Sequence, residues 1–226
     1  FYRAESQFAA DDKKNARRDY ETLYSKHPDS LRAREARLRA AEAVMHLDNP
    51  QIAIKELASL ADAKDADALY LTAQAQERLG NNSEAVQLYR RIYYELPATT
   101  ASVKAEERLA AVNPPGQALA ASFAEQRSRA DELFAAKQYF EAAKAYDALL
   151  AAFPDAERLD EVQLRRGTSL YLGKQPAQAV LPLANVSGRN ADLQAGFDAD
   201  DDCVVVVATP LQHVFDDVSC RCTRGC

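Results

Sequence analysis

Cysteine is missing from most of this chain of 226 residues, because Cys203, Cys220, Cys222 and Cys226 all lie at or beyond position 203. The body therefore has no disulfide framework and must depend on a packed core. The cysteines near the C-terminus lack the Cys-x-x-Cys pair and the histidine spacing of a zinc site, so we expect no metal site and no cofactor.

Glycine and long apolar runs are also scarce. The chain has seven glycines, 47% hydrophobic residues and 27% charged residues, a composition that suits a helical protein with a sizeable core. No apolar run reaches the roughly 18 to 20 residues that a membrane-spanning helix needs. We therefore expect no transmembrane segment.

An excess of basic charge is absent as well. The formal charge is −6, and residues 191–226 contribute −5 of it through seven aspartates and two arginines. The remaining body is nearly neutral. Binding to nucleic acid needs a basic face that displaces counterions from phosphates, so we expect no nucleic-acid partner.

One pattern of small residues recurs along the chain. An alanine is followed twelve residues later by a second alanine, then four residues later by tyrosine and eight residues later by proline. The three full copies are Ala4, Ala16, Tyr20 and Pro28; Ala73, Ala85, Tyr89 and Pro97; and Ala130, Ala142, Tyr146 and Pro154. Two weaker copies place leucine where tyrosine stands, namely Ala41, Ala53 and Leu57, and Gly167, Ala179 and Leu183.

This spacing predicts a pair of helices joined by a short turn. Small residues on both helices let the two backbones approach closely, and the aromatic residue packs over the next turn of the second helix. Proline ends the second helix, because it lacks an N–H and disfavours a helical residue before it. Within the turns, Asn49 before Pro50 is typical of an N-cap followed by proline at the first helical position.

The repeats predict an all-α fold, a solenoid of helical hairpins. Residues 1–112 contain three hairpins and a capping helix over Thr100–Val112, with Val103, Ala105, Leu109 and Ala110 on its apolar side. A proline-rich linker over 113–120 precedes two further hairpins over 121–190. The aspartate-, valine- and cysteine-rich tail, 191–226, departs from the repeats, and Val204–Val207 is typical of a short strand.

These spaced residues resemble the tetratricopeptide repeat family, and Ala68–Pro97 match its pattern best. The resemblance implies a scaffold that binds a protein or peptide along the inner face of its first helices. Counting from the small residue of each first helix gives a predicted binding stripe. It consists of Leu38, Glu42, Met45, Tyr70, Gln74, Glu77, Arg78, Asp131, Phe134, Thr168 and Tyr171. Alternatively, Tyr70, Phe134 and Tyr171 only pack between neighbouring hairpins.

The chain also resembles, more specifically, the helical superhelix that precedes the catalytic domain of soluble lytic transglycosylases. Leu88–Pro97, the following helix, the prolines and Arg129–Phe134 carry this likeness. Glu5-Ser6-Gln7-Phe8 is similar to the catalytic glutamate motif of that family, but the expected downstream context is absent, so an exposed helix face is the favoured interpretation.

We therefore expect a non-catalytic scaffold for protein–protein or cell-wall-associated binding, in the bacterial periplasm or alternatively in the cytoplasm. The alternatives are the architectural part of a transglycosylase that acts on peptidoglycan, and an outer-membrane assembly or Tol-Pal type protein.

Overall fold

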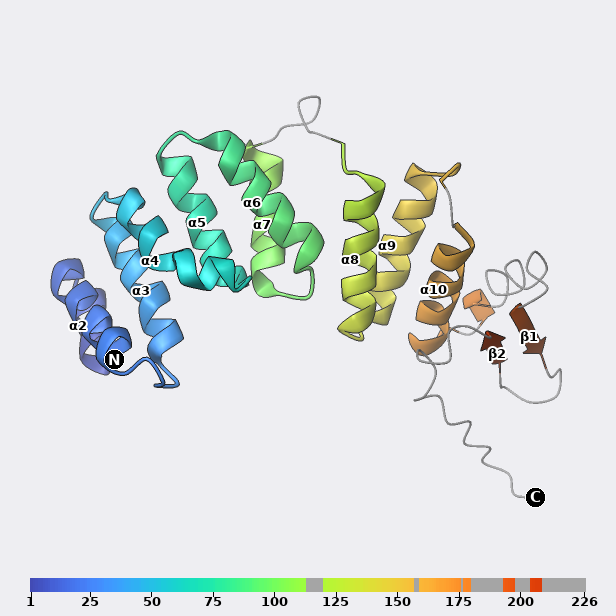
Figure 1. The fold of residues 1–226 in the computed structure, drawn as a ribbon, viewed down its shortest axis with the longest axis horizontal. Coiled ribbons are helices and arrows are strands. Elements are labelled where there is room, and N and C mark those ends of the chain that lie inside the picture. The colour runs from blue at the N-terminus through green and yellow to red at the C-terminus, as the bar shows by residue number, and fades with distance from the viewer. Residues whose placement is uncertain (113–119, 157–158, 176, 180–192, 198–203, 209–226) are drawn as a thin grey trace, which may run out of the picture. The chain divides into compact units, whose positions relative to one another are not determined.

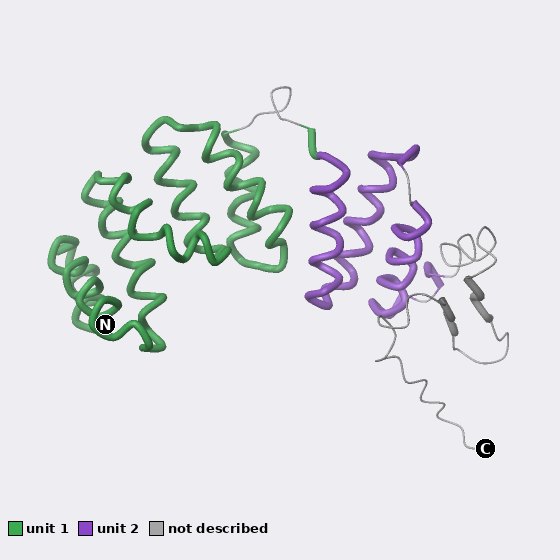
Figure 2. Tube along the Cα trace, viewed as in Figure 1, with its two compact units in different colours: residues 1–121 green, residues 122–226 purple. Residues whose placement is uncertain are grey.

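A computed structural model describes the whole chain except residues 113–119, 157–158, 176, 180–192, 198–203 and 209–226. The chain forms two compact units, Phe1–Ala121 and Ser122–Cys226, which are coloured separately in Figure 2. Each unit has its own hydrophobic core.

The first unit is a succession of helices in which each helix packs against the next (Figure 1). Its helices are α1 (Tyr2–Ala9), α2 (Lys13–Lys26), α3 (Ala33–His46), α4 (Pro50–Asp62), α5 (Ala66–Arg78), α6 (Asn82–Glu95) and α7 (Thr100–Val112). The first helices of successive hairpins also touch, since α3 contacts α5 and α5 contacts α7. Helical hairpins are thus stacked side by side along this unit.

The second unit contains α8 (Phe123–Ala135), α9 (Tyr139–Ala152) and α10 (Leu159–Leu172), followed by β1 (Leu193–Phe197) and β2 (Val204–Ala208). The two strands pair antiparallel, with Leu193 opposite Ala208 and Phe197 opposite Val204. The predicted all-α array of hairpins is confirmed for the repeat body. The strands belong to the tail, where the valine run forms β2.

Each second helix of a full repeat ends two residues before its proline. Helices α2, α6 and α9 end at Lys26, Glu95 and Ala152. The next residue leaves the helical conformation in nearly the same way each time, with φ values of −134°, −129° and −134°. Proline excludes a helical residue before it, which explains the common geometry.

The repeated small residues lie where the helices approach most closely. Ala73 of α5 and Ala85 of α6 are fully buried together with Tyr89, and their counterparts in the other full repeats are equally buried. A larger side chain at these positions would separate the helices. The sequence spacing therefore reports the packing register of each hairpin.

The turns between first and second helices share a left-handed residue. Asp11, Asp48, Gly80, Lys137 and Lys174 occupy this position, with φ between 59° and 77°. A single left-handed residue ends the first helix and turns the chain toward the second helix.

Two details differ from the sequence-based expectations. Asn49 stands at the N-cap of α4 and Pro50 follows at its first turn, but the Asn49 side chain makes no capping bond and donates instead to the Leu47 carbonyl at 2.6 Å. On α7, Val103 is 60% exposed, because Ala101 and Ala105 occupy the side that faces the core.

The structure describes part of the predicted fifth hairpin. Its first helix is α10, and Ala179 is buried at the beginning of the expected second helix. Leu183 and residues 113–119 of the expected linker lie outside the described residues.

Candidate functional site

The predicted binding stripe lies entirely on first helices of hairpins. Seven of its residues are on α3 and α5 in the first unit, and four are on α8 and α10 in the second unit. Each unit therefore carries its own part of the stripe.

Two apolar residues of the stripe are not available to a partner. Leu38 and Met45 are only 8% and 5% exposed and belong to a core cluster that includes Ala68 and Ala75 of α5. At these positions α3 faces the next hairpin rather than solvent. The prediction that Leu38 and Met45 line a binding surface is corrected: they pack the hairpins together.

Glu77 of α5, another stripe residue, connects three consecutive helices. The hydroxyl of Tyr89 on α6 donates to Oε1 of Glu77 at 2.5 Å. From α7, Arg108 donates through Nε to the same oxygen at 3.2 Å and through Nη2 to Oε2. The Glu77 side chain is only 15% exposed, so its charge is used within the fold.

The same arrangement occurs in the other two full repeats. We call each set a tyrosine–carboxylate–arginine cluster. In one cluster, Glu5 of α1 accepts from the Tyr20 hydroxyl of α2, and Arg39 Nη2 of α3 donates to Glu5 at 3.1 Å. In the other, Asp131 of α8 accepts from the Tyr146 hydroxyl of α9 at 2.6 Å and lies 3.7 Å from Nε of Arg165 on α10.

The arginine stands nineteen residues after the tyrosine in every cluster, at positions 20 and 39, 89 and 108, and 146 and 165. Sequence analysis identified the tyrosines but missed the arginines. The fixed tyrosine-to-arginine spacing was the available signal. The arginine comes from the helix that follows each hairpin, so the cluster connects the hairpin to that next helix.

In these clusters, the tyrosine and the arginine each keep a single protonation state. Burial, and then the hydrogen bond to Glu77, raises the pKa of Tyr89 well above its ordinary value. Burial and Asp131 act in the same way on the pKa of Tyr146. The hydrogen bond to Glu77 raises the pKa of Arg108. Tyrosine therefore stays a donor and arginine stays charged, as a structural network requires.

The second hairpin replaces this polar network with apolar packing. Leu57 stands where the other hairpins have tyrosine, and it is fully buried. Leu71, two residues before the small Ala73, occupies the place that Arg39 and Arg165 hold before Ala41 and Gly167. Leu71 packs against the cluster that contains Leu57, so both partners are apolar here.

Two other polar residues of the stripe, on α3 and α5, also have hydrogen-bond partners within the fold. Glu42 accepts from Arg39 at 2.8 Å. The exposed Arg78 donates to the backbone carbonyl of Met45, which connects α5 to α3.

The aromatic stripe residues are half-buried. The ring of Tyr70 lies 5.6 Å from that of Tyr89, and Lys104 of α7 stands 5.7 Å over it. Gln74 donates to the Tyr70 hydroxyl at 3.4 Å. Part of this ring, with Gln74 and Lys104 beside it, stays accessible to a partner, although packing also uses the ring.

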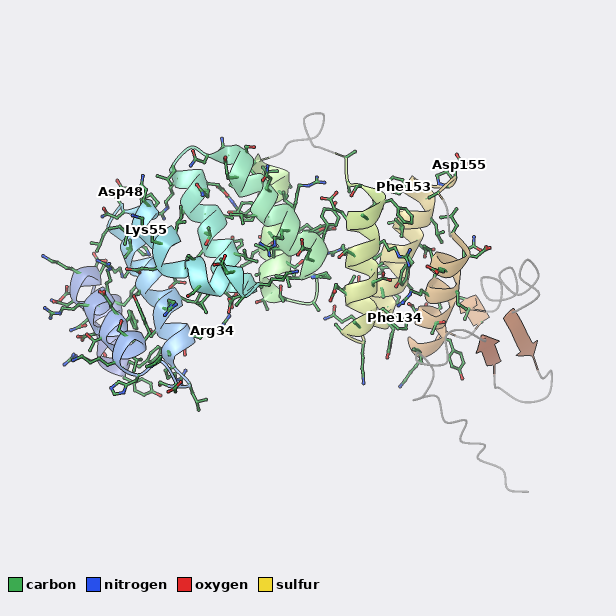
Figure 3. The ribbon with its side chains drawn as sticks, in the orientation of Figure 1. Arg34, Asp48, Lys55, Phe134, Phe153 and Asp155 are labelled. Carbon is green, nitrogen blue, oxygen red and sulfur yellow. The ribbon has the colours of Figure 1, made fainter. Side chains whose placement is uncertain are left out.

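The aromatic stripe residues of the second unit are likewise half-buried and partly used in packing. Phe134, labelled in Figure 3, has Tyr139 at a ring distance of 5.5 Å and Arg165 at 5.7 Å. On α10, Thr168 donates to the Leu164 carbonyl at 2.9 Å, and Tyr171 is half-buried. Tyr70 and Phe134 each pack in part against a core cluster, so packing and a binding role both remain open for these rings.

Metal-ligating side chains do not gather in the part of the chain that the structure describes. No group of three or more metal-ligating side chains occurs among those residues. Within the same residues, no helix has the length and apolar character that crossing a membrane requires. The four cysteines lie outside them.

A model of the tetratricopeptide repeat family matches residues 1–30 and 67–99. These stretches hold the first and third hairpins, and each contains a cluster tyrosine. The match supports a repeat scaffold for protein–protein interaction. No curated protein matches the chain.

Solved structures of similar fold have low sequence identity. MamA is 15% identical, with 84% of this chain and 88% of that chain covered and a TM-score of 0.33. A tetratricopeptide repeat protein from Parabacteroides merdae is 14% identical, with 83% and 77% covered and a TM-score of 0.37. The TPR2AB domain of yeast Sti1 in complex with pHSP90 is 15% identical, with 84% and 75% covered and a TM-score of 0.40. None of these likenesses indicates what this chain binds.

Proposed function

We propose that this chain is a non-catalytic tetratricopeptide-type scaffold of the bacterial envelope, which holds an extended protein segment along its first helices. The observation that carries the proposal is the accessible part of Tyr70, bordered by Gln74 and Lys104 on α5 and α7. Aromatic rings beside flexible polar groups are common anchors for peptides.

The surroundings of Tyr70 are fixed before any partner arrives. Glu77 is held by both Tyr89 and Arg108, and Arg78 is anchored on α3. A partner therefore has fewer side chains to immobilise, which lowers the entropic cost of binding. A face of this kind suits recognition of a segment that is itself flexible.

The envelope location is proposed only from the sequence resemblance around Leu88–Pro97 to soluble lytic transglycosylases. The comparisons lend no support to the transglycosylase part of that resemblance. Glu5, the residue that the motif would make catalytic, is held by Tyr20 and Arg39. A scaffold whose partner is a protein, as in outer-membrane assembly or Tol-Pal type proteins, is therefore preferred to a lytic enzyme.

Site-specific photocrosslinking tests this proposal. A photoreactive amino acid is placed at Gln74 on α5 or, as a matched control, at the exposed Gln87 on α6. In bacteria that express the chain with an export signal, we expect one recurrent protein adduct at position 74 and none at 87, with the crosslinks mapping to a single segment.

Equal adducts at both positions contradict the proposed face. Sedimentation of the chain with purified peptidoglycan, without a protein adduct at position 74, contradicts a protein partner and favours the cell-wall alternative.

A further inference from the structure

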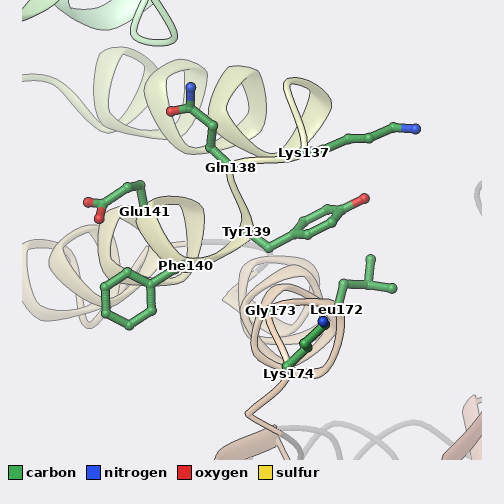
Figure 4. Close-up of a pocket in the computed structure, with 8 residues that line it drawn as sticks. All are labelled: Lys137, Gln138, Tyr139, Phe140, Glu141, Leu172, Gly173 and Lys174. Carbon is green, nitrogen blue, oxygen red and sulfur yellow. The ribbon is translucent and has the colours of Figure 1, made fainter.

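A shallow pocket of about 360 Å³ lies in the second unit, away from the tyrosine–carboxylate–arginine cluster (Figure 4). The turn from α8 to α9, the start of α9 and the end of α10 enclose it. The pocket lies at these turns because the close packing of the helices in each repeat brings the turns together.

The pocket has an apolar lining. Tyr139 lies between the two turns and packs edge-on against Phe134, and Leu172 lies next to Tyr139. A Cβ at Gly173 would lie 2.9 Å from the Ser169 carbonyl oxygen, which is too close for a larger residue in this backbone, and 3.6 Å from Cβ of Tyr139, which is an ordinary van der Waals contact. The pocket can accept an apolar side chain.

Two lysines border this lining, one from each turn. Lys137 and Lys174 are exposed, and neither forms an ion pair with any residue that the structure describes. The acidic residue of the rim, Glu141, is already paired with Lys144 at 3.1 Å. The pocket therefore presents two uncompensated positive charges around an apolar centre.

The turn conformation does not account for these lysines. Both have a φ of 61°, a left-handed conformation that glycine, asparagine and aspartate adopt more readily. The corresponding turns of the first unit indeed use Asp11, Asp48 and Gly80. Lysine at both positions of the second unit is thus better explained by its charge than by the backbone.

We infer that this pocket is a docking surface for an acidic protein segment, which inserts one apolar side chain beside Tyr139 and places carboxylates near Lys137 and Lys174. The inference does not rest on the proposed function, because Lys137, Tyr139 and Lys174 are not part of the predicted binding stripe. Its charge complementarity predicts binding that weakens as salt is added.

A fluorescein-labelled peptide of sequence EEDFDEE, measured by fluorescence anisotropy at low salt, tests the inference. The double variant Lys137→Asn/Lys174→Asn removes both charges and keeps a residue that tolerates the left-handed turn. We expect its affinity to fall by about fivefold or more, as two partly screened charge pairs predict. The serine peptide EEDSDEE should also bind more weakly.

Lys64→Asn is the matched control. Lys64 also has a left-handed φ, of 58°, but lies in the first unit at the turn from α4 to α5. This variant should bind the phenylalanine peptide like the unchanged chain.

Three results overturn the inference: no measurable binding, equal binding of the phenylalanine and serine peptides, or equal affinity in the double lysine variant. Lysine-dependent binding of phosphatidylglycerol vesicles without peptide binding also overturns it, in favour of a lipid surface. Circular dichroism of each variant verifies that loss of affinity does not reflect loss of fold.

Discussion

Tyr146 of α9 donates its hydroxyl hydrogen to Oδ1 of Asp131 on α8 at 2.6 Å. Tyr146 belongs to the repeat pattern, and Asp131 belongs to the predicted binding stripe. Arg165 of α10 lies 3.7 Å from the same carboxylate oxygen, so Asp131 connects the hairpin of α8 and α9 to the helix that follows it.

Removing the Tyr146 hydroxyl should destabilise the second unit. Tyr146→Phe keeps the buried ring but leaves Asp131 without its donor, a loss of about 1 to 2 kcal/mol in the free energy of unfolding. Urea denaturation measures it. Tyr139→Phe is the control, because the Tyr139 hydroxyl makes no hydrogen bond within the described residues, and it should have a smaller effect. Equal losses in both variants contradict a role for the hydroxyl.

Overpacking the contact between paired helices should also be costly. Ala85→Leu and Ala142→Leu place three additional carbon atoms where side chains are 0% exposed, with an expected cost of about 1 to 3 kcal/mol. The exposed Ala148 lies on the same helix as Ala142, so Ala148→Leu is a matched control and should change the denaturation midpoint little. Unchanged midpoints for both buried substitutions would show that the repeat register is wrong.

The three cluster tyrosines should ionise at a higher pH than the exposed tyrosines. The pKa values of Tyr20, Tyr89 and Tyr146 are raised by burial and by their carboxylate partners. A phenol with a raised native pKa contributes stability below its unfolded pKa of about 10, and this stability is lost as pH increases above that value. Ultraviolet titration should therefore show a delayed ionisation step that coincides with unfolding, and Tyr146→Phe should reduce its amplitude. Ionisation of all ten tyrosines in one step near pH 10 would contradict the burial described here.

The chain should show no lytic activity on peptidoglycan. Glu5→Gln should instead lower thermal stability, because Glu5 accepts from Tyr20 and Arg39. Release of muropeptides can be measured by chromatography in parallel with melting. Turnover by the unchanged chain that disappears in Glu5→Gln would restore the catalytic interpretation of the Glu5–Phe8 motif.

Deleting residues 192–226 should leave the helicity and melting of the body nearly unchanged. Repeat periodicity ends before this segment, and β1 and β2 pair with one another. Circular dichroism of the shortened chain is the measurement. Aggregation or a much lower melting temperature would instead identify the tail as the cap that covers the last repeat.

The repeat register could be predicted because it depends on local spacing. Ala73, Ala85 and Tyr89 are buried together, as their intervals require. The carboxylate partner could not be assigned in the same way, because it does not keep a fixed offset from the small residue, whereas the arginine follows each tyrosine at a constant spacing of nineteen residues. The acceptor accordingly changes position, from the residue after Ala130 to the fourth residue after Ala73.

The binding stripe was less predictable than the fold. The same counting rule gave the exposed Arg78 and the buried Met45, since a first helix contacts both solvent and its neighbour. The sequence did not predict the lysine-bordered pocket, because its residues come from two separate turns. The feature that these turns share is a left-handed residue, Lys137 in one and Lys174 in the other.

The central claim is that a protein segment binds along the first helices. Isothermal titration calorimetry of the segment captured at position 74, with the chain and with Gln74→Arg and Gln87→Arg variants, tests it most directly. Gln74 is half-buried beside Tyr70 on the first helix α5, and Gln87 is exposed on the second helix α6, so the two variants compare a substitution at the proposed face with one on the paired helix. We predict an affinity loss of about tenfold or more for Gln74→Arg alone, equivalent to about 1.4 kcal/mol. Unchanged affinity in Gln74→Arg, or an equal loss in both variants, would contradict the claim.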